Sequence, residues 1–100
     1  MNKHPAVITI FSTDKGGRPS MPVGSGYSPH ACIADGEEYL PIVLHQVPAS
    51  ATFNAEFDAV IEFLYPDRLD YSILASGEVF DLVEGVKRVG RAKLAVLGSG

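Results

Sequence analysis

Alternation of apolar and polar side chains is clearest in the stretch Phe57-Asp58-Ala59-Val60-Ile61-Glu62-Phe63. Side chains two residues apart point to the same face of a β-strand, so this period of two predicts a strand with one buried face. The other face would carry Asp58 and Glu62, with Glu56 just before them. Half-buried strands of this kind are typical of antiparallel sheets. The residues expected to point inward are Phe57, Ala59, Ile61 and Phe63, with Phe80 and Leu82 of a later strand.

The same pattern recurs on both sides of this stretch. Apolar residues alternate in residues 6–11 and 39–45, and a further apolar run covers residues 79–83. Turns rich in glycine, proline and aspartate separate the runs, as in a small barrel or sandwich. Pro41 lacks the N–H that a central strand needs, so we expect it at a sheet edge or a bulge. The sequence therefore predicts an all-β antiparallel fold.

The last apolar run is expected to form the final strand. Alternation again separates an inward face of small and apolar residues from an outward, mostly charged face. Those expected to face inward are Gly90, Ala92, Leu94 and Val96, and those expected to face outward together are Lys87, Val89, Arg91 and Lys93.

Length and composition indicate one domain over residues 1–100. The chain has 100 residues, of which 46% are hydrophobic and 20% charged, enough for one core but not for two. A lone cysteine, Cys32, excludes an internal disulfide and a zinc site built from cysteines. The sequence has no targeting leader and no apolar run of the roughly 18 residues that a membrane span needs. We therefore expect a cytoplasmic domain that makes no contact with membranes.

Charge is distributed unevenly along the chain. The formal net charge is −4, and eleven of the twelve acidic residues lie between Asp35 and Glu84. Four of the eight basic residues lie between Lys87 and Lys93, and Lys15 and Arg18 flank a glycine pair near the beginning. This asymmetry fits an oriented binding surface, and it fits an ordinary solvated surface equally well.

Motifs for catalysis, metals and cofactors are missing from the sequence. The three histidines are scattered, and no His-x-x-x-His or Cys-x-x-Cys spacing accompanies them. Neither a nucleophile elbow nor a phosphate-binding glycine loop is present. We therefore expect a protein that is not an enzyme and that uses no cofactor and no metal.

Two turns combine glycine with basic residues, and both are expected at strand ends. The first glycine turn is Lys15-Gly16-Gly17-Arg18, and the second is Gly85-Val86-Lys87-Arg88. Glycine supplies the positive φ angles of tight turns, and arginine offers a planar fork of donors to an anion. In one interpretation the glycines close hairpins and the bases are simply solvated. In the other, backbone N–H groups and Arg18 form an anion-binding edge that the basic strand extends. The candidate binding residues are Lys15, Gly16, Gly17, Arg18, Tyr27, Lys87, Arg88, Arg91 and Lys93.

These two turns also carry a family resemblance. Residues 7–11 lead into Asp14-Lys15-Gly16-Gly17-Arg18 and then Gly26-Tyr27-Ser28-Pro29. Later, residues 79–85 lead into Arg88-Val89-Gly90. From about Ala6 to about Leu97, the order of these elements resembles the third, C-terminal β-barrel domain of elongation factor Tu.

The resemblance implies a six-stranded antiparallel β-barrel of the translation elongation factor third-domain type. In that family the domain has no catalytic residue. It packs against a GTPase domain and a second barrel, and it helps to grip aminoacyl-tRNA and the exchange factor. GTP binding is not implied here, because the sequence has no GTPase segment. Ser28 replaces a family arginine and Val86 a family glycine, so we expect the scaffold to be kept and the binding task to differ.

The leading hypothesis is a non-enzymatic, freestanding binding module that engages a protein partner or pairs with itself as a dimer. Surface that neighbouring domains cover in the family would be exposed here, and such apolar patches mark interfaces. Its expected members are Tyr27, Phe53, Tyr65 and Tyr71. The alternatives are a module that binds tRNA or other RNA through its basic edge, and a mimic that competes with elongation factor Tu for a partner.

Overall fold

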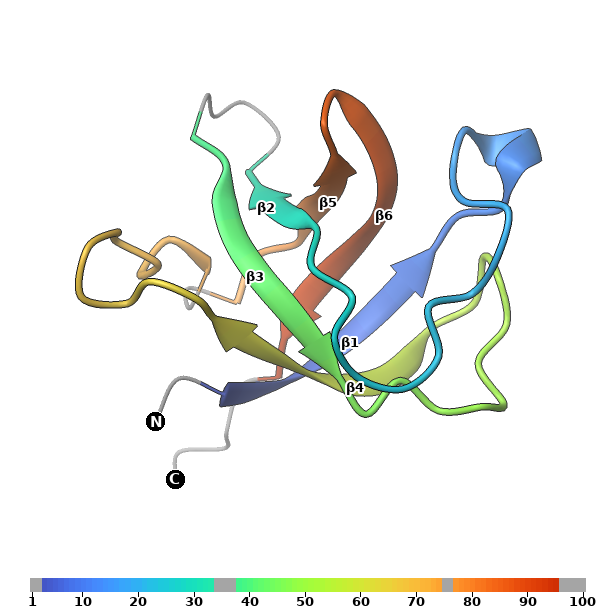
Figure 1. Ribbon diagram of the computed structural model, residues 1–100, viewed down its shortest axis with the longest axis horizontal. Helices are drawn as coiled ribbons and strands as arrows, with labels where there is room; N and C mark the ends of the chain where they lie inside the picture. The colour runs from blue at the N-terminus through green and yellow to red at the C-terminus, as the bar shows by residue number, and fades with distance from the viewer. Residues whose placement is uncertain (1–2, 34–37, 75–76, 96–100) are drawn as a thin grey trace.

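The computed structural model describes residues 3–33, 38–74 and 77–95, which form six strands and one short 3-10 helix (Figure 1). Four of the strands, at residues 3–10, 40–45, 57–63 and 80–84, are rich in the apolar and β-branched residues that favour extended backbone. The elements are β1 (Lys3–Ile10), η1 (Thr13–Lys15), β2 (His30–Cys32), β3 (Leu40–His45), β4 (Phe57–Phe63), β5 (Phe80–Glu84) and β6 (Lys87–Leu94).

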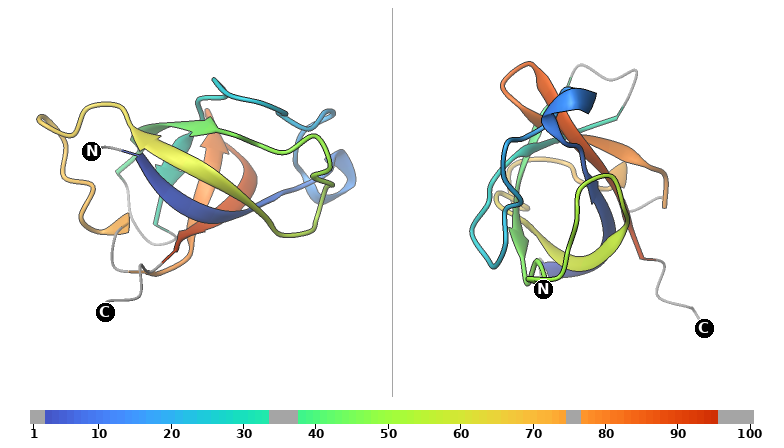
Figure 2. Two further views of the ribbon diagram at one scale, coloured as in Figure 1. Left: turned by 90° about the horizontal axis from the view of Figure 1, so that it is seen from below. Right: turned by 90° about the vertical axis from the view of Figure 1, so that its right-hand side faces the viewer.

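The strands close into a barrel in the order β1-β4-β3-β2-β5-β6, with β6 pairing back onto β1. Every pairing is antiparallel. The two views of Figure 2 show these strands winding around a common interior. This confirms the predicted all-β class and the small six-stranded antiparallel barrel.

The interior is filled by the residues that alternation had predicted to face inward. Every one that lies within the described residues is buried, and all of these except Gly90 belong to one hydrophobic core with Ile8, Ile42 and Leu44. The predicted inward residues found buried are Phe57, Ala59, Ile61, Phe63, Phe80, Leu82, Gly90, Ala92 and Leu94. Val96, also expected inward, lies outside the described residues.

The expectation that Val89 faces outward is wrong, because β6 contains a β-bulge. Leu82 on β5 lies opposite Gly90, but the next residue, Val83, lies opposite Arg88. Val89 is therefore the extra residue on β6, and its side chain is fully buried. Without this bulge strict alternation would turn Arg88 inward; with it, Arg88 stays exposed.

The expectation that Pro41 marks an edge or a bulge is also wrong. Pro41 lies in β3, which runs between β4 and β2 in the closed barrel. Pairing with β4 starts one residue later, where Ile42 lies opposite Phe63, the last residue of β4. The Ile42 N–H points the other way, to the carbonyl of Pro29 at 3.2 Å. The N–H that Pro41 lacks would thus face chain beyond β4, where no ladder bond is lost.

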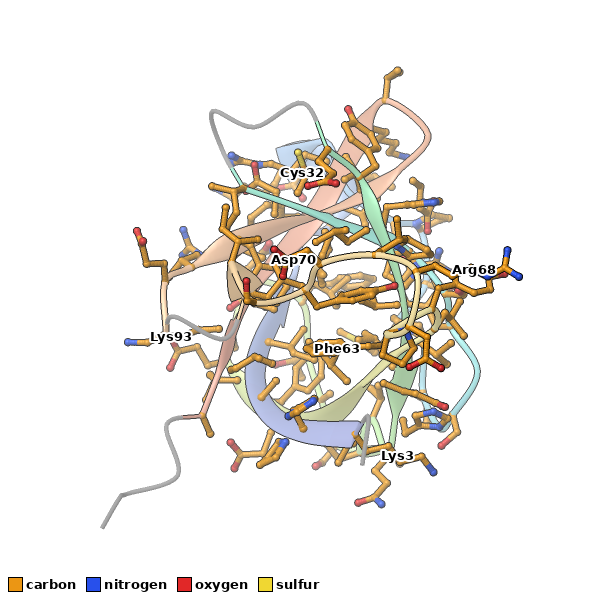
Figure 3. All side chains as sticks on the ribbon, turned by 90° about the vertical axis from the view of Figure 1, so that its left-hand side faces the viewer. Lys3, Cys32, Phe63, Arg68, Asp70 and Lys93 are labelled. Atoms are coloured by element: carbon orange, nitrogen blue, oxygen red, sulfur yellow. The ribbon has the colours of Figure 1, made fainter. Side chains whose placement is uncertain are left out.

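Residues 64–74, called the end segment below, cover one end of the barrel. Tyr71 stacks on Phe63 with ring centroids 4.4 Å apart, and Phe63 stacks on His4 at the same distance. The Tyr71 hydroxyl donates a hydrogen bond to the carbonyl of Pro41 at 2.7 Å. Figure 3 looks onto this end, with Phe63 inside the barrel.

The end segment corrects the expectation of an exposed aromatic patch. Tyr71 was expected at the surface but is only 5% exposed. Tyr27 and Phe53 are half-buried and pack against the core. Of the four expected members, Tyr65 is the exposed one, at 52%.

Candidate binding surfaces

The first glycine turn is shaped by a close approach between two backbone segments. Gly16 ends η1 with φ 85°, a left-handed conformation that favours glycine. A Cβ on Gly17 would lie 1.8 Å from the carbonyl oxygen of Phe11. That oxygen accepts the N–H of Arg18 at 2.8 Å. Both glycines therefore serve the backbone path, and this path fixes where Lys15 and Arg18 emerge.

Arg18 binds a carboxylate of its own chain. Its guanidinium forms an ion pair with Glu84, and the Tyr27 hydroxyl donates a hydrogen bond to the same carboxylate oxygen. The guanidinium carbon also lies 4.4 Å from the centre of the Tyr27 ring, a cation–π geometry. Two predicted site residues thus meet, together with an acid that the sequence had not singled out. They fasten the segment after η1 to the end of β5.

The ionisation of this cluster reflects its partial burial. Burial raises the pKa of Tyr27, and the neighbouring Glu84 carboxylate raises it further. For Glu84, burial opposes ionisation, but hydrogen bonds from Tyr27 and Arg18 outweigh it, so the pKa of Glu84 is below its usual value. At neutral pH the cluster therefore holds a carboxylate, a guanidinium and a neutral phenol.

The second glycine turn is the two-residue connection between β5 and β6. Gly85 has φ 61° at the first central position, as type II′ turns require. Lys87 lies directly opposite Glu84 across this hairpin, and its charge also lowers the pKa of Glu84. Lys87 therefore sits beside the Arg18–Glu84 cluster.

Three further basic residues gather around the ring of Phe11. The guanidinium carbons of Arg88 and Arg91 lie 5.3 Å and 5.9 Å from its centroid. Together with Lys15, these groups line a shallow hollow of about 210 Å³. We call Phe11, Lys15, Arg88 and Arg91 the Phe11 cluster. Asp81, 3.6 Å from Arg88, offsets part of its charge.

A different arrangement covers the outer surface of β4, β1 and β6, called the β1 face below. Val7 on β1 lies opposite Asp58 on β4 and opposite Lys93 on β6, so these three side chains form a row across the sheet. Thr9 lies opposite Arg91, and Glu56 borders it on the other side. Acids thus line one flank of β1 and bases the other, with uncharged side chains between them.

The charges of the central row are free to act outward. Asp58 and Lys93 are exposed, and among the described residues neither is ion-paired. In Figure 3 the Lys93 side chain extends away from the barrel, on the side opposite Arg68. A hollow of about 270 Å³ lies on this face, lined by Val7, Thr9, Glu56, Val79, Arg91, Ala92 and Lys93.

The predicted basic edge is therefore divided over three places. Arg18, Tyr27 and Lys87 lie around Glu84. Lys15, Arg88 and Arg91 line the hollow at Phe11. Lys93 lines the hollow on the β1 face, and Arg91 borders both hollows. Sequence reasoning missed Glu84 and Phe11, because their partners are distant in the chain. The acids of β4 could have been singled out, because alternation predicts that they face outward. Their position relative to the bases could not be predicted from the sequence.

Other kinds of site find little support in the described part of the chain. Residues 3–33, 38–74 and 77–95 contain no group of three or more His, Cys, Asp or Glu side chains that could hold a metal ion. None of the helical structure described there is long and apolar enough to cross a membrane. In comparisons with known proteins, no family model and no curated protein matches this chain.

Proposed function

We propose that this chain is a non-enzymatic binding module that engages a protein through the β1 face. The observation that carries the proposal is the separation of charge on this face. Asp58 lies on one side of Val7 and Lys93 on the other, and neither is neutralised by the described part of the chain. A partner with the opposite arrangement would pair with both flanks at once.

Physical reasons favour a protein over a polyanion at this face. A nucleic acid presents negative charge only, so the acids on β4 would repel it while the bases on β6 attract it. A folded protein can present both signs and an apolar strip between them. Complementarity of this kind selects the partner and its orientation more than it adds affinity.

Site-specific photo-crosslinking in the source cell tests the proposal. A photo-reactive amino acid in place of Val7 is expected to give a protein adduct that disappears when Lys93 is changed to Glu. The matched control replaces Val86, which is 95% exposed at the tip of the β5–β6 hairpin. No Val7 adduct, or equal adducts from both positions, would contradict the proposal.

RNA binding is a second candidate, and the Phe11 cluster is the observation that favours it. Three cations line one hollow beside an aromatic ring, a combination that suits a phosphate next to a stacked base. Anisotropy of a labelled RNA in a salt titration checks this. The logarithm of the binding constant should fall linearly with the logarithm of the salt concentration. The double variant Lys15→Glu with Arg88→Glu should lose RNA binding. Absence of binding at low salt would end this candidacy.

The resemblance to the third barrel domain of elongation factor Tu stays a prediction. Under it, the protein bound by the β1 face would be a partner of that factor, and the chain would act as a competing mimic. An adduct from the Val7 experiment identifies the partner by mass and so separates this version from pairing with a second copy.

A further inference from the structure

We propose that the β1 face is complementary to itself and that its occupant is a second copy of this chain, related by a two-fold axis that runs roughly along β1. The inference rests on the proposed function, because it names the protein that the face would engage. It follows from the order of strands and from the register between them.

The register places the face in rows perpendicular to β1. In the central row Val7 lies between Asp58 and Lys93. Asp58 and Lys93 are two inter-strand spacings apart, about 10 Å between backbones. They form no ion pair with each other in the structure. Each charge is therefore available to a group above the sheet.

The next row toward the beginning of β1 is apolar. Pro5 lies opposite Val60 on β4, and the N–H of Ala95 donates to the carbonyl of Pro5 at 2.9 Å. The row on the other side of Val7 repeats the charge order, with Glu56 beside Thr9 and Arg91 opposite it. Acid, uncharged strand and base thus follow one another in the same direction in two rows.

Symmetry decides how two such faces can meet. A two-fold axis along β1 exchanges the flanks and keeps the rows, so β4 of one copy faces β6 of the other. Asp58 of each copy then faces Lys93 of the other copy, so this contact occurs twice. The apolar row of one copy meets the apolar row of the other. A two-fold axis across the strands would instead place β4 on β4 and β6 on β6, which opposes like charges. The charge pattern therefore selects the first arrangement, an isologous pair.

The contact is small, so pairing should be weak and sensitive to salt. Three strands with two or three outward residues each fall below the area of standard stable interfaces. We expect a dissociation constant on the order of 10–100 µM, which rises with ionic strength because the charged groups are exposed.

Charge reversal with mixing tests the arrangement. Lys93→Glu places acid against acid at both ends of the central row, and Asp58→Lys places base against base. Each variant alone should pair at least about tenfold more weakly than the unmodified chain. In an equimolar mixture, a Lys93→Glu copy and an Asp58→Lys copy present opposite charges at both contacts. The mixture should therefore recover pairing to within about twofold of the unmodified chain.

Sedimentation velocity at low salt measures four samples: the unmodified chain, each variant alone, and the mixture with one variant carrying a fluorescent label. The matched controls are Arg68→Glu and Asp67→Lys, which reverse exposed charges on the end segment. Neither control should change pairing, and mixing them should have no effect. Circular dichroism of every variant verifies that the barrel is intact.

The outcomes are distinct. Loss in both single variants with recovery in their mixture supports the two-fold arrangement. A strict monomer at about 1 mM, where even weak pairs are populated, overturns it. So does pairing that the reversals leave unchanged, or that the mixture fails to restore. A monomer whose Val7 position still crosslinks to another protein in cells would end this inference and leave the proposed function standing.

Discussion

The covered end of the barrel and the β1 face use polar groups in opposite ways. At the covered end, the Tyr71 hydroxyl binds the Pro41 carbonyl and its ring stacks on Phe63, so these groups are satisfied inside the chain. On the β1 face, Asp58 and Lys93 stand about 10 Å apart in one row, and neither is ion-paired within the described residues. One region is complete in itself and the other is open to a partner.

This difference separates stability from recognition. Side chains that pack and bond within the chain contribute to the free energy of unfolding. Exposed charges contribute little to it, because water screens them. Substitutions in the two regions should therefore change different measurements, and the following predictions test that division in order of decreasing effect on stability.

Truncation at the covered end should have the largest effect. Phe63→Ala removes a buried ring that contacts both His4 and Tyr71. The free energy of unfolding should fall by about 3–5 kcal/mol, as in other large-to-small core changes. Chemical denaturation measures it. An unchanged midpoint in a soluble variant would contradict both the strand assignment and the view of this end as structural.

Substitution in the Arg18–Glu84 cluster should have an intermediate effect on stability, because its charges are paired within the chain but partly exposed to water. Glu84→Gln should lower stability at neutral pH by about 1–2 kcal/mol, with the Glu84 side chain 35% exposed and partly screened. Since folding lowers the pKa of Glu84, the contribution is present above its usual value of 4.5. It is lost as pH falls through the lower folded value.

Thermal unfolding across this pH range measures the gap between the two proteins. The difference should shrink on acidification. The control Glu78→Gln changes an exposed acid outside the cluster, and its stability should differ little from that of the unmodified chain. A gap that persists at the acid end would mean that the charge of Glu84 is not what stabilises the cluster.

Lys93→Glu should have the smallest effect on stability, within about 0.5 kcal/mol, because its side chain is exposed and unpaired. The same substitution should have a large effect on pairing between copies. A Lys93→Glu variant with much lower stability would contradict the separation of stability from recognition. Its loss of pairing would then reflect damage to the barrel.

The sequence predicts the fold best where apolar and polar residues alternate along a strand. Residues 57–63 alternate without interruption, so their inward side chains could be assigned from the period alone. The bulge at Val89 left no such mark, because it arises from pairing with β5. Tyr71 lies in a segment without alternation, and its burial depends on Phe63 and Pro41.

The site was harder to predict because its geometry joins distant parts of the chain. Arg18 was singled out for its chemistry, but its partner Glu84 lies 66 residues away. The sequence predicts that the acids of β4 face outward and that the bases of β6 face outward. Their arrangement on the two flanks of β1 appears only once the barrel is closed.

The strand order also sets when this chain can fold during synthesis. β1 pairs with β4 and β6, so neither neighbour exists until residues 57–63 and 87–94 have been made. Until then Ile8 and Ile10, fully buried in the finished barrel, remain in contact with water. Long-range pairing of this kind places barrel folding in the millisecond-to-second range. The barrel therefore cannot close before β6 has been made, because β6 pairs with β1. Until then we expect the apolar strands to be exposed and prone to aggregation.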